Sequence, residues 1–103
     1  MNVKTPGFIL DFIDSLDRMT RSKAIELLDT LRMSDYQIVF SYSKKIDMEL
    51  FELKIRSAKQ VRLLYTYHNG SILVLHIFVK KTWKIPLQEL DTARQRLKVL
   101  RNI

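Results

Sequence analysis

The chain from Glu52 to Pro86 reads ELKIRSAKQVRLLYTYHNGSILVLHIFVKKTWKIP. Apolar and charged residues alternate along much of it, and the Asn69-Gly70 pair interrupts it with a strong hairpin signal. This pattern predicts three short neighbouring strands, which are Phe51–Arg56, Val61–Tyr67 and Ile72–Lys80. We expect them to form an antiparallel sheet, because only short loops join them.

Apolar residues with helical spacing flank the strands on both sides. Before the strands, one stripe follows the helix-start signal Thr5-Pro6 and reaches Leu16, and a second follows a predicted cap at Thr20. After the strands, a third stripe reaches Leu100. This order predicts an α+β fold, with two N-terminal helices, a small antiparallel sheet of three to four strands and a C-terminal helix.

Length and composition favour a single domain over residues 1–103, because the chain is short and 47% hydrophobic. No cysteine is present, which excludes disulfides and cysteine-based zinc sites. The first residues lack a signal-peptide pattern, and the longest apolar run, Ile72–Val79, is too short to cross a bilayer. We therefore expect a cytoplasmic protein that has no membrane partner.

Positive charge is concentrated in the second half of the chain. Met1–Glu52 carries 7 Lys and Arg against 9 Asp and Glu, a net −2, whereas Leu53–Ile103 carries 11 against 2, a net +9. The two halves sum to the formal charge of +7. A small domain with such a field attracts polyanions, so RNA, DNA or a phosphate-rich surface is the first partner to consider.

The hairpin register decides which side chains share a face of the sheet. A two-residue turn at Asn69-Gly70 pairs Leu63 with His76 and places Arg62 among apolar neighbours, where an unpaired guanidinium is costly. A three-residue turn pairs Arg62 with His76. We favour the second register, because it leaves no buried charge. It groups Val61, Leu63, Tyr65, Leu73, Leu75, Ile77 and Val79 on the core face, and Arg62, Leu64, Thr66, Ile72, Val74, His76, Phe78 and Lys80 on the other.

Several motifs, taken in order, resemble the RelE/HigB toxin superfamily, and in particular its phage-derived HigB-like branch. They are Phe12–Leu16, Tyr42–Lys45, Phe51–Arg56, Arg62–Tyr65, Leu75–Lys81 and Lys84–Pro86. Together they extend over nearly the whole chain. One departure is that family members usually open with a full strand, whereas only Met1–Lys4 precede the first helix here, so the first strand is expected to be absent or shortened.

The resemblance implies a toxin of a type II toxin–antitoxin system with a RelE-like fold. Such toxins are metal-independent endoribonucleases that need no cofactor and cleave mRNA on the ribosome, and a cognate antitoxin, expected here to be a helix-turn-helix protein, holds them inactive. In this chemistry the ribose 2′-OH attacks the adjacent phosphate, so the protein supplies orientation, charge stabilisation and proton transfer. Two other functions remain open, a basic RNA- or ribosome-binding protein without catalysis and a ParE-like toxin that inhibits gyrase.

Matching positions to the resemblance gives four candidate catalytic residues. Arg62 is expected to hold the scissile phosphate, with Lys54 and Arg56 positioning it and Lys80 acting as acid, base or phosphate contact. His76 is a candidate for proton transfer, with packing at the sheet surface as the plainer alternative. Further contacts to RNA are expected from Lys81, Lys84, Lys44, Lys45, Phe78 and Trp83.

Aromatic residues near these cations have competing interpretations. Phe78 and Trp83 are candidates for stacking on bases, although Trp83 would equally suit covering the start of the last helix. Tyr65 is expected in the core, and Tyr42 lies in a lysine-rich segment that could contact the RNA backbone or simply be solvated. Two histidines without suitably spaced carboxylates predict no metal site.

Overall fold

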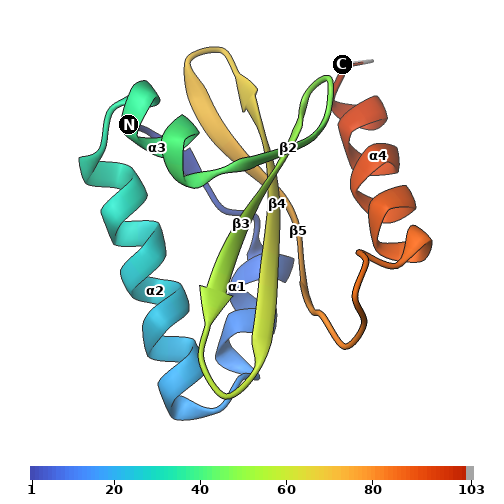
Figure 1. The fold of residues 1–103 in the computed structure, drawn as a ribbon. Helices are drawn as coiled ribbons and strands as arrows, with labels where there is room; N and C mark the ends of the chain where they lie inside the picture. Colours follow the sequence, from blue (N-terminus) through green and yellow to red (C-terminus); the bar gives the residue numbers. More distant parts are fainter. Residues whose placement is uncertain (102–103) are drawn as a thin grey trace.

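A computed structural model describes residues 1–101 and has one five-stranded sheet with helices on both faces (Figure 1). The elements in chain order are β1 (Val3–Lys4), α1 (Gly7–Asp14), α2 (Arg18–Met33), α3 (Tyr36–Tyr42), β2 (Lys44–Asp47), β3 (Leu50–Arg56), β4 (Gln60–His68), β5 (Ser71–Val79) and α4 (Leu87–Arg101). The strand order is β1-β5-β4-β3-β2, with β1 parallel to β5 and the other pairs antiparallel. The predicted α+β class is confirmed, and the sheet has one strand more than the upper expected number.

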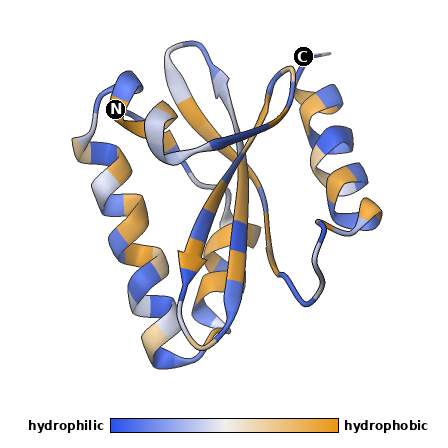
Figure 2. Ribbon diagram, viewed as in Figure 1, coloured by the Kyte–Doolittle hydropathy of each residue, from blue (hydrophilic) through white to orange (hydrophobic). Residues whose placement is uncertain are grey.

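The sheet separates two apolar cores. The helices α1, α2 and α3 pack on one face, where Ile9, Leu28 and Val39 meet Leu63 and other strand residues. Helix α4 packs on the other face, where its Ala93 joins a smaller apolar cluster that contains Leu50, Leu64, Leu75 and Phe78. Figure 2 shows hydrophobic and hydrophilic residues alternating along helices and strands, as expected for elements with one buried side.

The N-terminal helices differ from the prediction in their boundaries. The cap of α2 is Asp17 rather than Thr20, since its side chain accepts a hydrogen bond of 3.1 Å from the Thr20 backbone nitrogen. A further helix, α3, was not predicted. Its cap is Asp35, whose carboxylate accepts from the Ile38 backbone nitrogen at 3.0 Å. The aspartates at the starts of both helices are the usual signal, which the apolar spacing alone did not reveal.

The outer strands also modify the expected sheet. The first strand is present but shortened, because β1 pairs with β5 only at Val3 with Ile72 and Lys4 with Leu73. At the opposite edge, the lysine-rich segment before β3, for which no strand was predicted, forms the strand β2. Only the first part of β3 therefore has β2 as a neighbour.

The preferred hairpin register is wrong at the turn. Asn69 and Gly70 both have positive φ, 51° and 75°, and form a two-residue turn that pairs His68 with Ser71. A bulge then changes the phase, because Tyr65 pairs with Val74 whereas Leu64 pairs with His76. Leu75 is the extra residue of this bulge, and neither of the two predicted registers included a bulge.

The bulge divides β5 into two parts, and the alternation of side chains between the two faces of the sheet reverses from one part to the other. After it, His76 and Phe78 lie on the face of Arg62, as predicted, although Arg62 pairs with Phe78 and not with His76. Before it, the prediction is reversed. Ile72 and Val74 belong to the core of α1 and α2, and the residues expected there, Leu73 and Leu75, face α4 instead.

Candidate nucleic-acid interface

Four candidate catalytic cations lie on one face of three neighbouring strands. Lys54 of β3 is the cross-strand partner of Arg62 in β4, and Arg56 follows Lys54 by two residues on the same face. Lys80 follows Phe78, the partner of Arg62 in β5, by two residues. Its backbone nitrogen donates to the Gln60 carbonyl at 2.6 Å, so the chain continues beside β4 past the end of β5. The register therefore brings the four residues to a common strip.

Arg62 and Glu52 form a buried ion pair beneath this strip. They are only 6% and 2% exposed, and 3.8 Å separates Arg62 Nε from Glu52 Oε2. That distance permits Coulomb attraction but is too long for a hydrogen bond, and neither of these two buried atoms has another partner among residues 1–101. Arg62 Nη1 donates to the Val61 carbonyl at 3.2 Å and to Gln60 Oε1 at 3.4 Å. The expectation that no charge would be buried is therefore wrong.

Glu52 is the residue of this site that sequence reasoning missed. The two-residue period of a strand places it on the same face as Lys54 and Arg56, and that period was the available signal. Its cross-strand partner Leu64 is two residues from Arg62, so Glu52 reaches the guanidinium diagonally. Because the pair is incompletely hydrogen-bonded, Arg62 retains donor capacity for an anion.

A shallow hollow of about 510 Å³ lies on one side of this pair. It is lined by Gln60, Arg62, Lys80, Lys81, Thr82 and Trp83. Trp83 is 98% exposed, so the alternative in which it covers the start of the last helix is wrong. Lys84, the next residue, is also exposed but does not line the hollow.

A second hollow, of about 400 Å³, lies on the other side, along the edge of β3 that β2 leaves open. Its lining includes Tyr42, Ser43, Lys44, Glu52, Lys54 and Arg56. Lys44 pairs with Glu52 and so faces the strip, whereas Lys45 pairs with Phe51 and faces the opposite side of the sheet. Of the two predicted lysines in this segment, the structure therefore brings only Lys44 to the site.

Two of the aromatic candidates belong to the cores. Phe78 is 5% exposed and packs in the α4 cluster, so it cannot serve as a platform for a base, which corrects that prediction. Tyr65 is buried, as predicted, and stacks on Phe51 with 5.4 Å between ring centroids. Its hydroxyl shares hydrogen bonds with Ser43 Oγ at 2.5 Å and Tyr67 Oη at 3.0 Å, and burial raises the pKa of Tyr65.

His76 links β5 to α4. Its Nε2 lies 3.1 Å from a Glu89 carboxylate oxygen, and Arg96 Nη1 donates to its Nδ1 at 3.1 Å. Because an arginine can only donate, Nδ1 must carry a lone pair, and the neutral ring donates from Nε2 to Glu89. Burial lowers the pKa of His76 below 6.5, although Glu89 opposes the shift. The predicted pairing with Arg62 is wrong, and the observed contacts are those of the packing alternative.

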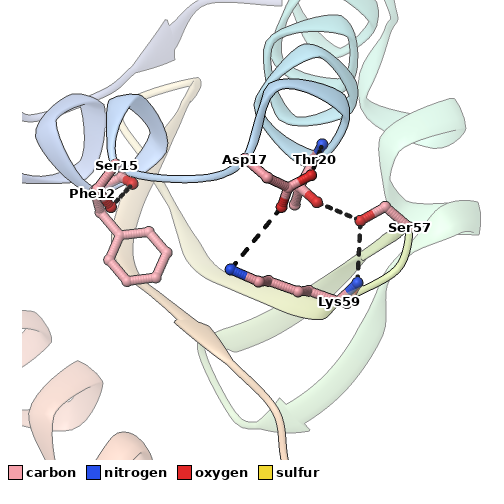
Figure 3. A network of polar contacts seen from close by, with 6 residues as sticks. All are labelled: Phe12, Ser15, Asp17, Thr20, Ser57 and Lys59. Carbon is pink, nitrogen blue, oxygen red and sulfur yellow. Dashed lines mark hydrogen bonds and ion pairs between the residues drawn. The ribbon is translucent and has the colours of Figure 1, made fainter.

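A polar network supports the tip of the hairpin that joins β3 to β4 (Figure 3). Thr20 Oγ1 and Ser57 Oγ lie 2.5 Å apart, and the Lys59 backbone nitrogen donates to Ser57 Oγ at 3.2 Å. Lys59 Nζ lies 3.9 Å from Asp17 Oδ1. These contacts join the tip to the start of α2. They hold in place the turn that separates Arg56 from Gln60, and thereby the strand ends that carry these two residues.

Within residues 1–101, no three His, Cys, Asp or Glu side chains come together in a way that could hold a metal ion. In the same part of the chain, no helix combines the length and the apolar character needed to cross a membrane.

The fold and the strip define an α+β protein with an open basic sheet face. A family model described as "Phage derived protein Gp49-like (DUF891)" matches residues 11–98, which is most of the chain. The chain therefore belongs to this phage-derived family, which is associated with toxin–antitoxin systems of RelE-like toxins. No curated protein matches the chain significantly.

Proposed function

We propose that this protein is the toxin of a type II toxin–antitoxin pair, of the HigB-like branch, and a metal-independent endoribonuclease that cleaves ribosome-bound mRNA. One observation carries the proposal. Lys54, Arg56, Arg62 and Lys80 share one face of three neighbouring strands, in the part of the sheet beside the α4 core. The family association with toxin–antitoxin systems supports the same conclusion.

The reaction needs no nucleophile from the protein. As the ribose 2′ oxygen bonds to phosphorus, the bond from phosphorus to the 5′ oxygen breaks. The 2′ proton passes to a base and the 5′ oxygen gains a proton, so the products are a 2′,3′-cyclic phosphate and a 5′ hydroxyl. The transition state is a crowded anionic phosphate, which positioned cations stabilise.

Arg62 is the residue that we assign to this phosphate. Glu52 and the two acceptors of Nη1 restrict its side chain, and its low exposure places it in a medium where charges interact more strongly than in water. Arg62 also lines the hollow that contains Lys80, so a phosphate oxygen in that hollow could accept a hydrogen bond from its guanidinium. Lys54 and Arg56 would position the substrate, and Lys80 would assist from the neighbouring hollow as acid, base or phosphate contact.

The remaining cations would hold the flanking chain. Lys81 and Lys84 lie beside Trp83, and Lys44 lies at the far hollow, where they would contact RNA phosphates or ribosomal RNA. Lys45 faces away and would reach only RNA that wraps around the sheet edge. The partner protein would be a helix-turn-helix antitoxin that keeps the toxin inactive.

The proposal is tested by inducing the chain in cells and mapping new mRNA 5′ ends. We expect translation-dependent cuts, which are lost in Lys54→Ala/Arg56→Ala and in Arg62→Ala. The double variant matters because Lys54 and Arg56 are exposed and their loss should leave the fold intact, whereas Arg62→Ala leaves Glu52 buried and unpaired. Arg18→Ala removes an exposed cation from α2 and should keep full activity.

Three outcomes would overturn the proposal. Normal growth without new 5′ ends would exclude a toxin of this kind. Arrest with intact mRNA and trapped gyrase complexes would indicate ParE-like action. Salt-dependent binding to RNA and ribosomes without any cleavage product would indicate a binding protein that lacks catalysis.

A further inference from the structure

The two hollows lie on opposite sides of the Lys54–Arg62 pair. One hollow contains Arg62 and the other contains Lys54, and these residues are direct cross-strand partners. Neighbouring strands are about 4.8 Å apart, so the path from β2 across β3 and β4 to the chain after β5 covers about 15 Å. The hollows and the cross-strand pair therefore form one strip that runs across the strands.

An exposed aromatic side chain marks each end of this strip. Trp83 lines the hollow beside Arg62, and Tyr42, which is 71% exposed, lines the hollow beside Lys54. Each has a lysine from its own segment in the same hollow, Lys81 and Lys44 respectively. Proteins that bind single-stranded nucleic acid commonly combine cations that bind the backbone with aromatic rings on which bases stack. A base can stack on such a ring only when it is not paired within a duplex.

We propose that an unpaired RNA strand crosses β3 and β4 along this strip, with one base stacked on Trp83 and another on Tyr42. The phosphates between them lie on Lys54 and Arg62. The inference rests on the proposed function for its substrate class, and it adds the path of the RNA and the two stacking platforms. Stacking tolerates any base, so the strip itself contributes little sequence preference.

The single tryptophan of the chain makes this path directly measurable. The full chain is titrated with a short single-stranded oligonucleotide that carries 2′-O-methyl groups at every ribose and so cannot be cleaved. We expect quenching of Trp83 fluorescence on binding. A hairpin duplex of the same sequence should produce no comparable quenching, because its bases remain paired.

Variants test each platform separately, with affinity measured from the anisotropy of a labelled oligonucleotide. Loss of one stacked base corresponds to a weakening of about 5- to 150-fold. We therefore expect Trp83→Leu and Tyr42→Leu each to weaken binding by about tenfold or more, while Trp83→Phe and Tyr42→Phe remain within about threefold of the original affinity. The matched control is Tyr36→Leu, an exposed aromatic of α3 that lines neither hollow.

The outcomes separate this path from the endoribonuclease proposal. Quenching and the expected losses of affinity support the path even if no mRNA is cut in cells, a result that would overturn the proposed activity alone. If mRNA is cut but Trp83 fluorescence does not respond, the path is wrong. The path is also wrong if both leucine variants bind like the original chain, or if the duplex quenches as strongly as the single strand.

Discussion

The two faces of the sheet are built from the same strands but differ in the residues that they carry. On the side of α1 and α2, residues such as Leu53, Val61 and Leu63 form a continuous apolar core. On the side of α4, the core is smaller, and the face continues past it with the buried Arg62 and the exposed Lys54. Helix α4 covers only part of its face and leaves a charged part beside it, whereas strand alternation keeps the positions of β3 and β4 on the first face mainly apolar.

The largest expected effect tests whether the buried charges on the α4 side serve function rather than stability. Glu52→Leu leaves the Arg62 guanidinium buried without its counter-ion and should lower the free energy of unfolding by about 3–5 kcal/mol. The double variant Glu52→Leu/Arg62→Met should recover most of that loss but show no cleavage, because an apolar pair removes the desolvation cost together with the phosphate contact. Urea denaturation measures the stability of the single and the double variant, and mapping of mRNA 5′ ends measures cleavage. A double variant as unstable as the single one would mean that the pair is needed for packing.

The next effect compares two neighbours that face opposite ways. Leu63→Ala opens a cavity in the core of α1 and α2 and should cost about 2–4 kcal/mol. Lys54→Ala, one strand away on the other face, should change stability by no more than about 0.5 kcal/mol but reduce RNA cleavage. Equal losses of stability in the two variants would show that the two faces do not differ in their contribution to stability.

A smaller effect concerns the turn that sets the phase of β4 and β5. Gly70 has a φ of 75°, where a side chain is strained even though nothing lies within 4 Å of the added Cβ position. Gly70→Ala should therefore destabilise by about 1–2 kcal/mol. Gly7→Ala is the matched control, because Gly7 starts α1 in equally open space and without positive φ. It should be neutral or slightly stabilising, and thermal unfolding of both variants provides the test.

The smallest effect is the pH response of the α4 side. Burial lowers the pKa of His76 in the folded chain below 6.5, its ordinary value in the unfolded chain. At a pH between the folded and the unfolded pKa, the unfolded chain therefore binds the proton more readily than the folded one. Its contribution is complete above about pH 6.5 and is lost as the pH falls through the folded pKa. We expect stability to decrease from pH 7.5 to 5, and His76→Asn to flatten that decrease. An unchanged slope in His76→Asn would show that other groups cause it.

Much of the fold followed from local sequence signals. The two-fold alternation located β3, β4 and β5, the apolar spacing located three helices, and Asn69-Gly70 located the hairpin. The bulge at Leu75 could not be read from the sequence, because no glycine or proline marks it within an all-apolar run. The preference for a longer turn came from the assumption that Arg62 could not be buried.

The cations of the candidate site could be predicted from the sequence, but the burial of the residues around them could not. Strand periodicity places Lys54 and Arg56 on one face, and the register of β3 and β4 adds Arg62 to it. The sequence could not say how far α4 extends over that face, and this decides that Phe78 is core whereas Trp83 is exposed. The role of Glu52 depends on a diagonal contact between two strands, which emerges only when the register is known.

The extra residue at Leu75 also affects how relatives of this chain should be aligned. Along β5 the pattern of inward and outward positions reverses at this residue, so even-numbered positions up to Val74 and odd-numbered positions from Ile77 face the same layer. A homologue that lacks the extra residue should need a one-residue gap here, and an ungapped alignment would match its core positions to the opposite side of the strand. Deleting the Leu75 codon would restore one continuous alternation along β5, but it would also remove a buried residue of the α4 cluster.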